Sequence, residues 1–122
     1  MRLSFIQLSG FTVNWKRLRL SDDDLRRLES LILAAPDAAP VMRGTGGLRK
    51  LRLAPASAAG GKSGGVRVCY AYFADFGLVY LCAAFAKSDK ANLTAAERAE
   101  FKAVLDAFGR YLRENWSKGW TP

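Results

Sequence analysis

The feature that most constrains the fold is a pair of strand-like runs joined by a very short turn. The first run, VRVCYAYFA at 66–74, is rich in β-branched and aromatic residues. The turn DFG follows, and LVYLCAAFAK at 78–87 continues with a similar composition. Two such runs around a short glycine-containing turn predict a tight antiparallel hairpin.

Two helix patterns flank this hairpin. The earlier one follows Ser21, which suits a helix N-cap, and acidic residues fill its first turn. Its apolar stripe consists of Leu25, Leu28, Leu31 and Ile32. The later helix follows Thr94, which forms a capping-box pattern with Glu97. Its apolar stripe consists of Phe101, Leu105, Phe108 and Leu112.

Two further strands are predicted by rough alternation, at 2–8 and 48–54. The segment GFTVNWKRLRL, between the first strand and the first helix, is expected to add a short helical turn. The resulting order is strand, helix, three consecutive strands, helix. We therefore expect an α+β fold, a small antiparallel sheet with an N-terminal helical region and a C-terminal helix packed on one face. A single domain spans 1–122, with a tail at about 114–122.

Charge and the missing residue types narrow the possible chemistry. The 122 residues include 19 Lys and Arg against 11 Asp and Glu, a net charge of +8, and no histidine. A small domain this basic is typical of polyanion-binding proteins, the alternative being a charge that only keeps the chain soluble. The absence of histidine excludes a Ser-His-Asp triad and most zinc chemistry. Cys69 and Cys82 form no metal or disulfide framework, so we expect no metal and no cofactor.

No apolar run is long enough to cross a membrane, and the N-terminus is too interrupted for a secretory signal. We therefore expect a cytoplasmic protein with reduced thiols and no membrane partner. Residues 56–63, ASAAGGKS, match a loose phosphate-loop pattern, but a strand follows them where a helix would be needed. They are better interpreted as a long hairpin loop that carries Lys62.

Several basic side chains of the predicted strands can share one face. In LRKLRLA, Lys50 and Arg52 point away from the face that carries Arg49, Leu51 and Leu53. Arg67 is likewise opposite to its apolar neighbours in VRVCYAY, and Lys87 closes the last strand. If the strands are neighbours, these cations converge. Such a cluster favours a phosphodiester and offsets charge that develops on it, the alternative being separate solvated charges.

Three blocks in order, GTGGLRKLRLA, GGKSGGVRVCYAYF and LVYLCAAFAKSDKANLTAAERAEF, resemble the HigB-like branch of the RelE/ParE toxin superfamily. The resemblance implies a small basic α+β toxin of a bacterial type II toxin–antitoxin system. Such toxins enter the ribosomal A site and cleave translated mRNA without a metal. The implied partners are the ribosome, mRNA and a cognate HigA-like antitoxin with a helix-turn-helix domain. Operator DNA is bound only through that antitoxin.

The resemblance also assigns roles to individual residues. The catalytic basic residues fall on Lys50, Arg52, Arg67 and Lys87. Contacts to RNA or the ribosome fall on Arg49, Lys62 and Lys90. Leu93 lies in the region where several members carry a catalytic tyrosine, so the general base stays open among Lys87, Lys90 and Asp89. Two other functions remain as alternatives: a non-catalytic ParE-like inhibitor of DNA gyrase, and an inactive homologue that still binds its antitoxin.

Overall fold

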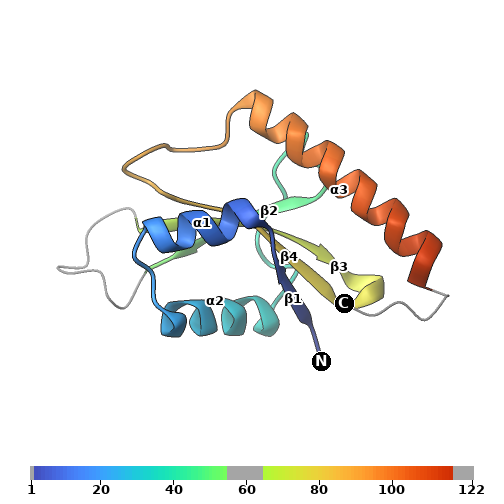
Figure 1. Ribbon diagram of the computed structural model, residues 1–122, viewed down its shortest axis with the longest axis horizontal. Coiled ribbons are helices and arrows are strands. Elements are labelled where there is room, and N and C mark those ends of the chain that lie inside the picture. Colours follow the sequence, from blue (N-terminus) through green and yellow to red (C-terminus); the bar gives the residue numbers. More distant parts are fainter. Residues whose placement is uncertain (1, 55–64, 117–122) are drawn as a thin grey trace.

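The structure is a computed structural model that describes residues 2–54 and 65–116 (Figure 1). Four strands form one sheet, and helices flank it. The elements are β1 Ser4–Gln7, α1 Ser9–Arg17, α2 Asp22–Ala34, β2 Leu48–Leu53, β3 Val66–Phe73, the 3-10 turn η2 Ala74–Phe76, β4 Leu78–Ala86 and α3 Ala95–Asn115. The α+β class predicted from the sequence is confirmed.

The predicted hairpin forms the centre of the sheet, whose strand order is β1-β4-β3-β2. β3 pairs antiparallel with both β4 and β2. The turn between β3 and β4 closes at Gly77, whose φ of +62° is a conformation that glycine adopts without strain. β1 differs from the expected antiparallel arrangement, because it runs parallel to β4, with Ser4 opposite Leu78 and Gln7 opposite Leu81.

Helices cover both faces of the sheet, whereas the sequence analysis placed them on one face. In Figure 1, α3 lies above the sheet and α2 below it. The reason is visible in β3, where alternate residues enter two separate cores: Val68 and Tyr70 belong to one, Cys69 and Ala71 to the other. A strand that is apolar on both sides needs cover on both sides.

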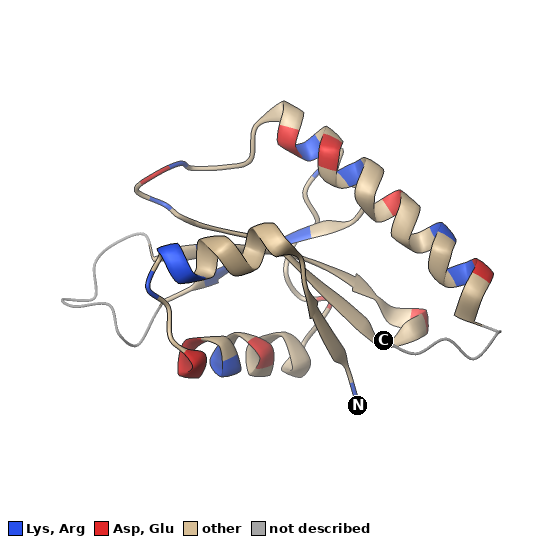
Figure 2. Cartoon of the chain, in the orientation of Figure 1, with Lys and Arg blue, Asp and Glu red and all other residues tan. Residues whose placement is uncertain are grey.

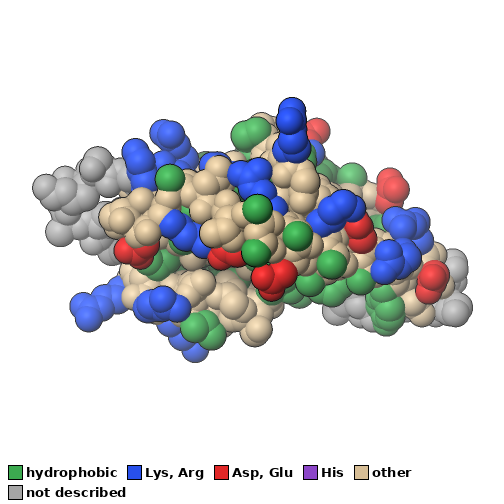
Figure 3. All heavy atoms as spheres, turned by 90° about the horizontal axis from the view of Figure 1, so that it is seen from above, with side chains coloured by type: hydrophobic (Ala, Val, Ile, Leu, Met, Phe, Trp, Pro, Cys, Tyr) green, Lys and Arg blue, Asp and Glu red, His purple; other side chains and the backbone are tan. Residues whose placement is uncertain are grey.

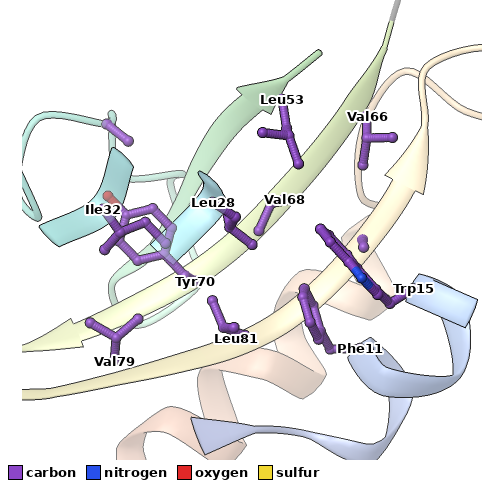
Figure 4. Close-up of a cluster of buried hydrophobic side chains, with 12 residues drawn as sticks. Phe11, Trp15, Leu28, Ile32, Leu53, Val66, Val68, Tyr70, Val79 and Leu81 are labelled. Atoms are coloured by element: carbon purple, nitrogen blue, oxygen red, sulfur yellow. The ribbon is translucent and has the colours of Figure 1, made fainter. Parts of the chain in front are cut away.

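The core beneath the sheet is built from both N-terminal helices (Figure 4). The segment expected to add a short helical turn is the nine-residue helix α1. Its Phe11 and Trp15 are four residues apart, so they share one helix face, and their rings stack at 5.2 Å between centroids. α2 adds Leu28 and Ile32, while Leu31, predicted to face inward, is 50% exposed.

The core above the sheet is built from α3. Thr94 and Glu97 form the predicted capping box, and Ser21 caps α2 through Asp24 in the same way. Of the predicted α3 stripe, Leu105 and Leu112 are buried, and Phe101 and Phe108 pack against them in part. Cys69 and Cys82 are free buried thiols in this core. No described helix is long and apolar enough to span a membrane.

Candidate active site

A hollow of about 520 Å³ opens where the start of β3 meets the end of β4. Four separate stretches of chain line it: the segment before β2, β2 itself, the start of β3 and the loop after β4. The lining residues are Ala39, Pro40, Lys50, Leu51, Arg52, Arg67, Lys87 and Ala91. The structure therefore brings together all four residues that the sequence analysis assigned to catalysis.

Strand register explains why these cations meet. Arg52 lies directly opposite Arg67, and Lys50 lies opposite Cys69, on the face of the sheet that α3 covers farther along. Lys87 directly follows β4, and its backbone N–H donates to the carbonyl of Gly65 at 3.2 Å. The end of β4 is thereby held beside the start of β3, and Lys87 beside Arg67.

The cations differ in how far they are buried. Arg67 is only 5% exposed, Lys50 is half-buried, and Arg52 and Lys87 are exposed. No buried side-chain nitrogen or oxygen in the described part of the chain lacks a hydrogen-bond partner. The buried nitrogens of the Arg67 guanidinium therefore have partners. A guanidinium stays protonated at any physiological pH. Arg67 thus supplies a buried positive charge to the hollow, and the exposed Arg52 and Lys87 stand at its rim.

Among the described residues, the lining carries no carboxylate. This is not a general property of the molecule: Figure 3, seen from the side of α3, shows acidic side chains among the Lys and Arg. The described residues also hold no cluster of three or more His, Cys, Asp or Glu side chains that could bind a metal ion. A hollow lined by cations and small apolar surfaces suits an anion such as a phosphodiester.

Arg49 is not among the lining residues. It is paired with Tyr70, on the opposite face from Lys50. Its Nη1 donates to the carbonyl of Asp37 at 2.9 Å and to that of Ala39 at 2.7 Å. Arg49 therefore fixes the segment that forms one wall of the hollow. Lys62, another of the predicted contacts to RNA or the ribosome, lies outside the described residues.

Lys90 is engaged elsewhere as well. Its Nζ lies 2.7 Å from both carboxylate oxygens of Glu97 and 5.3 Å from the centroid of the Phe85 ring. Hydrogen bonding from Lys90 and from the backbone at Thr94 holds the pKa of Glu97 below its ordinary value. Lys90 thus ties the loop after β4 to the first turn of α3. Leu93 lies in the region where several members of the resembled family carry a catalytic tyrosine. It is buried in the core beneath α3.

One nearby cation was missed by sequence reasoning. Burial raises the pKa of the Cys69 thiol to about 12, and the charges of Lys50, Lys90 and Arg98 oppose that rise. Arg98 therefore stands near the same part of the sheet as Lys50. It lies in the first turn of α3, where its guanidinium donates to the carbonyl of Arg43 at 3.3 Å. The one signal for Arg98 in the sequence was its position one turn after the predicted helix cap at Thr94.

The described residues thus form a four-stranded sheet between two N-terminal helices and a long C-terminal helix, with a cationic hollow at one end. No protein-family model matches the chain. Among solved structures, the chain is similar to the Escherichia coli toxin RelE, in a free-state mutant with two arginines replaced by alanine. The TM-score is 0.54 and the identity 16%, over 82% of this chain and 97% of that chain. This likeness establishes that the chain has a RelE-like fold.

Proposed function

We propose that this protein is the toxin of a bacterial type II toxin–antitoxin system, a ribosome-dependent endoribonuclease of the HigB-like branch. One observation carries the proposal: Lys50, Arg52, Arg67 and Lys87 line a single hollow in which none of the described lining residues is a carboxylate. The RelE-like fold supports it, because the similar solved structure is a toxin.

The chemistry that fits is internal transesterification of RNA. The 2′-hydroxyl loses its proton and attacks the adjacent phosphorus, and the bond to the 5′-oxygen breaks. The products are a 2′,3′-cyclic phosphate and a 5′-hydroxyl, which takes up a proton. The transition state carries extra negative charge on the phosphate oxygens, which Arg67, Lys50 and Arg52 are placed to stabilise.

Lys87 is the proposed proton carrier. It is exposed at the rim and has no ion pair recorded among the described residues, whereas Lys90 is held by Glu97. As an ammonium, Lys87 assists the leaving 5′-oxygen; as an amine, it assists the attacking 2′-hydroxyl. Its place in the hollow favours it over Lys90 and Asp89, neither of which lines that space.

The test is cleavage of a translated mRNA in a bacterial cell-free system. We expect Lys50→Ala and Arg67→Ala each to lower the rate by about 10²-fold or more, the scale of losing a group that stabilises transition-state charge. Because Arg67 is buried, Arg52→Ala provides an exposed alternative that leaves folding intact. Arg110→Ala, on the exposed side of α3, is the matched control for loss of one charge.

Two results would overturn the proposal. Full cleavage by both the Lys50 and Arg67 variants would remove the site assignment. Inhibition of DNA gyrase supercoiling, with mRNA left intact, would replace the nuclease with a ParE-like inhibitor.

The proposal also includes a HigA-like antitoxin with a helix-turn-helix domain, through which alone operator DNA is bound, and action in the cytoplasm. Growth arrest when the protein is induced alone, reversed by that antitoxin, is the expected cellular result.

A further inference from the structure

A second group of cations lies at the end of α1, outside the hollow. Lys16, Arg17 and Arg19 are all exposed. Arg17 donates to Oδ1 of Asn14 at 2.8 Å, a neutral partner. Within the described part of the chain, no ion pair is recorded for any of the three. Three adjacent unneutralised charges form a surface that favours an anion. We call these three residues the α1 basic end.

Arg19 adopts a backbone conformation that favours glycine. Its φ is +59°, and no other non-glycine residue in the described chain has a positive φ. The hydrogen bonds explain this: the N–H of Arg19 donates to the carbonyl of Lys16, and that of Leu20 to Trp15. This pattern is a Schellman motif with Arg19 at the position where glycine is preferred. An arginine there is strained, and such strain points to a role for the side chain.

The α1 basic end adjoins the candidate active site across one loop. Arg17 and Leu18 share a hollow of about 200 Å³ with Phe85, Asp89 and Lys90. Lys87 and Ala91, in the same loop, line the larger hollow. Figure 2 shows the basic end of α1 beside this loop. The two cationic surfaces are therefore neighbours, separated by the loop at 87–91.

We propose that the α1 basic end is a second RNA-binding surface, which holds backbone phosphates of structured RNA while a separate RNA strand occupies the hollow. This inference rests on the proposed function and specifies how the protein holds the ribosome. RNA is favoured over an acidic protein because the surface lies across one loop from a hollow suited to a phosphodiester. Contacts to RNA phosphates also need no exposed apolar anchor, because charge and hydrogen bonds make them.

The experiment measures binding to purified bacterial ribosomes by co-sedimentation over a range of salt concentrations. The variants are Arg19→Gly and the double change Lys16→Ala with Arg17→Ala, and Arg110→Ala is the control. Each lost phosphate contact should lower the magnitude of the slope of log K against log salt by about one. We expect Arg19→Gly to lose about one, the double variant about two and the control none.

Arg19→Gly separates binding from folding, because it places glycine where the backbone favours it. Its melting temperature should equal or exceed that of the parent while its ribosome affinity falls. In the cleavage assay, KM for translating ribosomes should rise with kcat unchanged, since the hollow is intact. A general loss of structure would instead lower both the melting temperature and kcat.

The outcomes also separate this inference from the proposed function. If the parent neither binds ribosomes nor cleaves mRNA, the proposed function fails. If the parent does both and the α1 variants match the control, the second surface is wrong while the function stands. If ribosome binding is unchanged but neutralisation by the antitoxin is lost, the surface binds a protein and the RNA assignment is overturned.

Discussion

Thr45 shows how one buried hydroxyl shapes the segment that leads into the site. It is fully buried, and its Oγ1 donates to the carbonyl of Met42 at 2.6 Å and accepts from the N–H of Leu48 at 3.0 Å. Gly44, Gly46 and Gly47 around it all have positive φ, and the Thr45 bonds add to the backbone bond from the N–H of Met42 to the carbonyl of Leu48 at 2.8 Å. The turn sets where β2 begins, and β2 carries Lys50 and Arg52.

Thr45→Val should lower the free energy of unfolding by about 1–3 kcal/mol, because it leaves a buried N–H and a buried carbonyl without their partner. Urea unfolding followed by circular dichroism measures this difference. Thr12→Val is the control: that hydroxyl bonds Gln7 on an exposed part of the chain, so its loss should cost clearly less. Equal effects of the two changes would contradict the role given to Thr45.

Residue-level assignments were predictable where strand alternation governs them. The face shared by Lys50, Arg52 and Arg67 follows from the period of two, and the register brings them together. Arg49 and Lys90 were not predictable as structural groups. Their partners, the carbonyls of Asp37 and Ala39 and the carboxylate of Glu97, become neighbours only through tertiary folding. The catalytic and RNA-binding roles stay predictions.

At the scale of elements, the start of α3 gives a pH-dependent contribution to stability. Glu97 accepts from Lys90 and from the backbone of Thr94, and both bonds lower its pKa from 4.5. Because the folded pKa lies below the unfolded one, the stabilisation is present above pH 4.5 and is lost as the pH falls through the folded value. Solvent exposure of the pair limits its size.

Glu97→Gln should remove this pH dependence while keeping a residue that suits the capping box. We expect the parent to be more stable than the variant at neutral pH, and the gap to shrink as the pH falls below 4.5. Urea midpoints measured at several pH values give the gap directly. A gap that stays constant over this range would show that the charge of Glu97 does not stabilise the folded state.

Most elements were predictable because their signals are local. The hairpin, the caps at Ser21 and Thr94 and the stripe of α3 depend only on nearby residues. α1 was underestimated, since a nine-residue helix gains its stability from packing Phe11 and Trp15 on the sheet. The parallel pairing of β1 with β4 and the covering of both faces depend on topology, which no local pattern reports.

At the scale of the whole molecule, the two thiols report on the integrity of the upper core. Burial raises the pKa of Cys69 and of Cys82 to about 12 each. Neither thiol forms a reactive thiolate at neutral pH in the folded state. An aromatic disulfide reagent at about pH 8 should therefore react with neither in the native protein and with both in guanidinium chloride. Immediate reaction of both thiols in buffer alone would show that α3 does not hold this core closed.

The position of β1 has a consequence for the order in which the chain acquires its form during synthesis. β1 is the first strand to leave the ribosome, and its partner β4 is the last. Until β4 emerges, β1 and the apolar face of α1 have no sheet to join, and their pairing has to close a long stretch of chain. Lys87 directly follows β4. The cationic hollow therefore cannot exist on a nascent chain until β4 and the loop that follows it have left the ribosome.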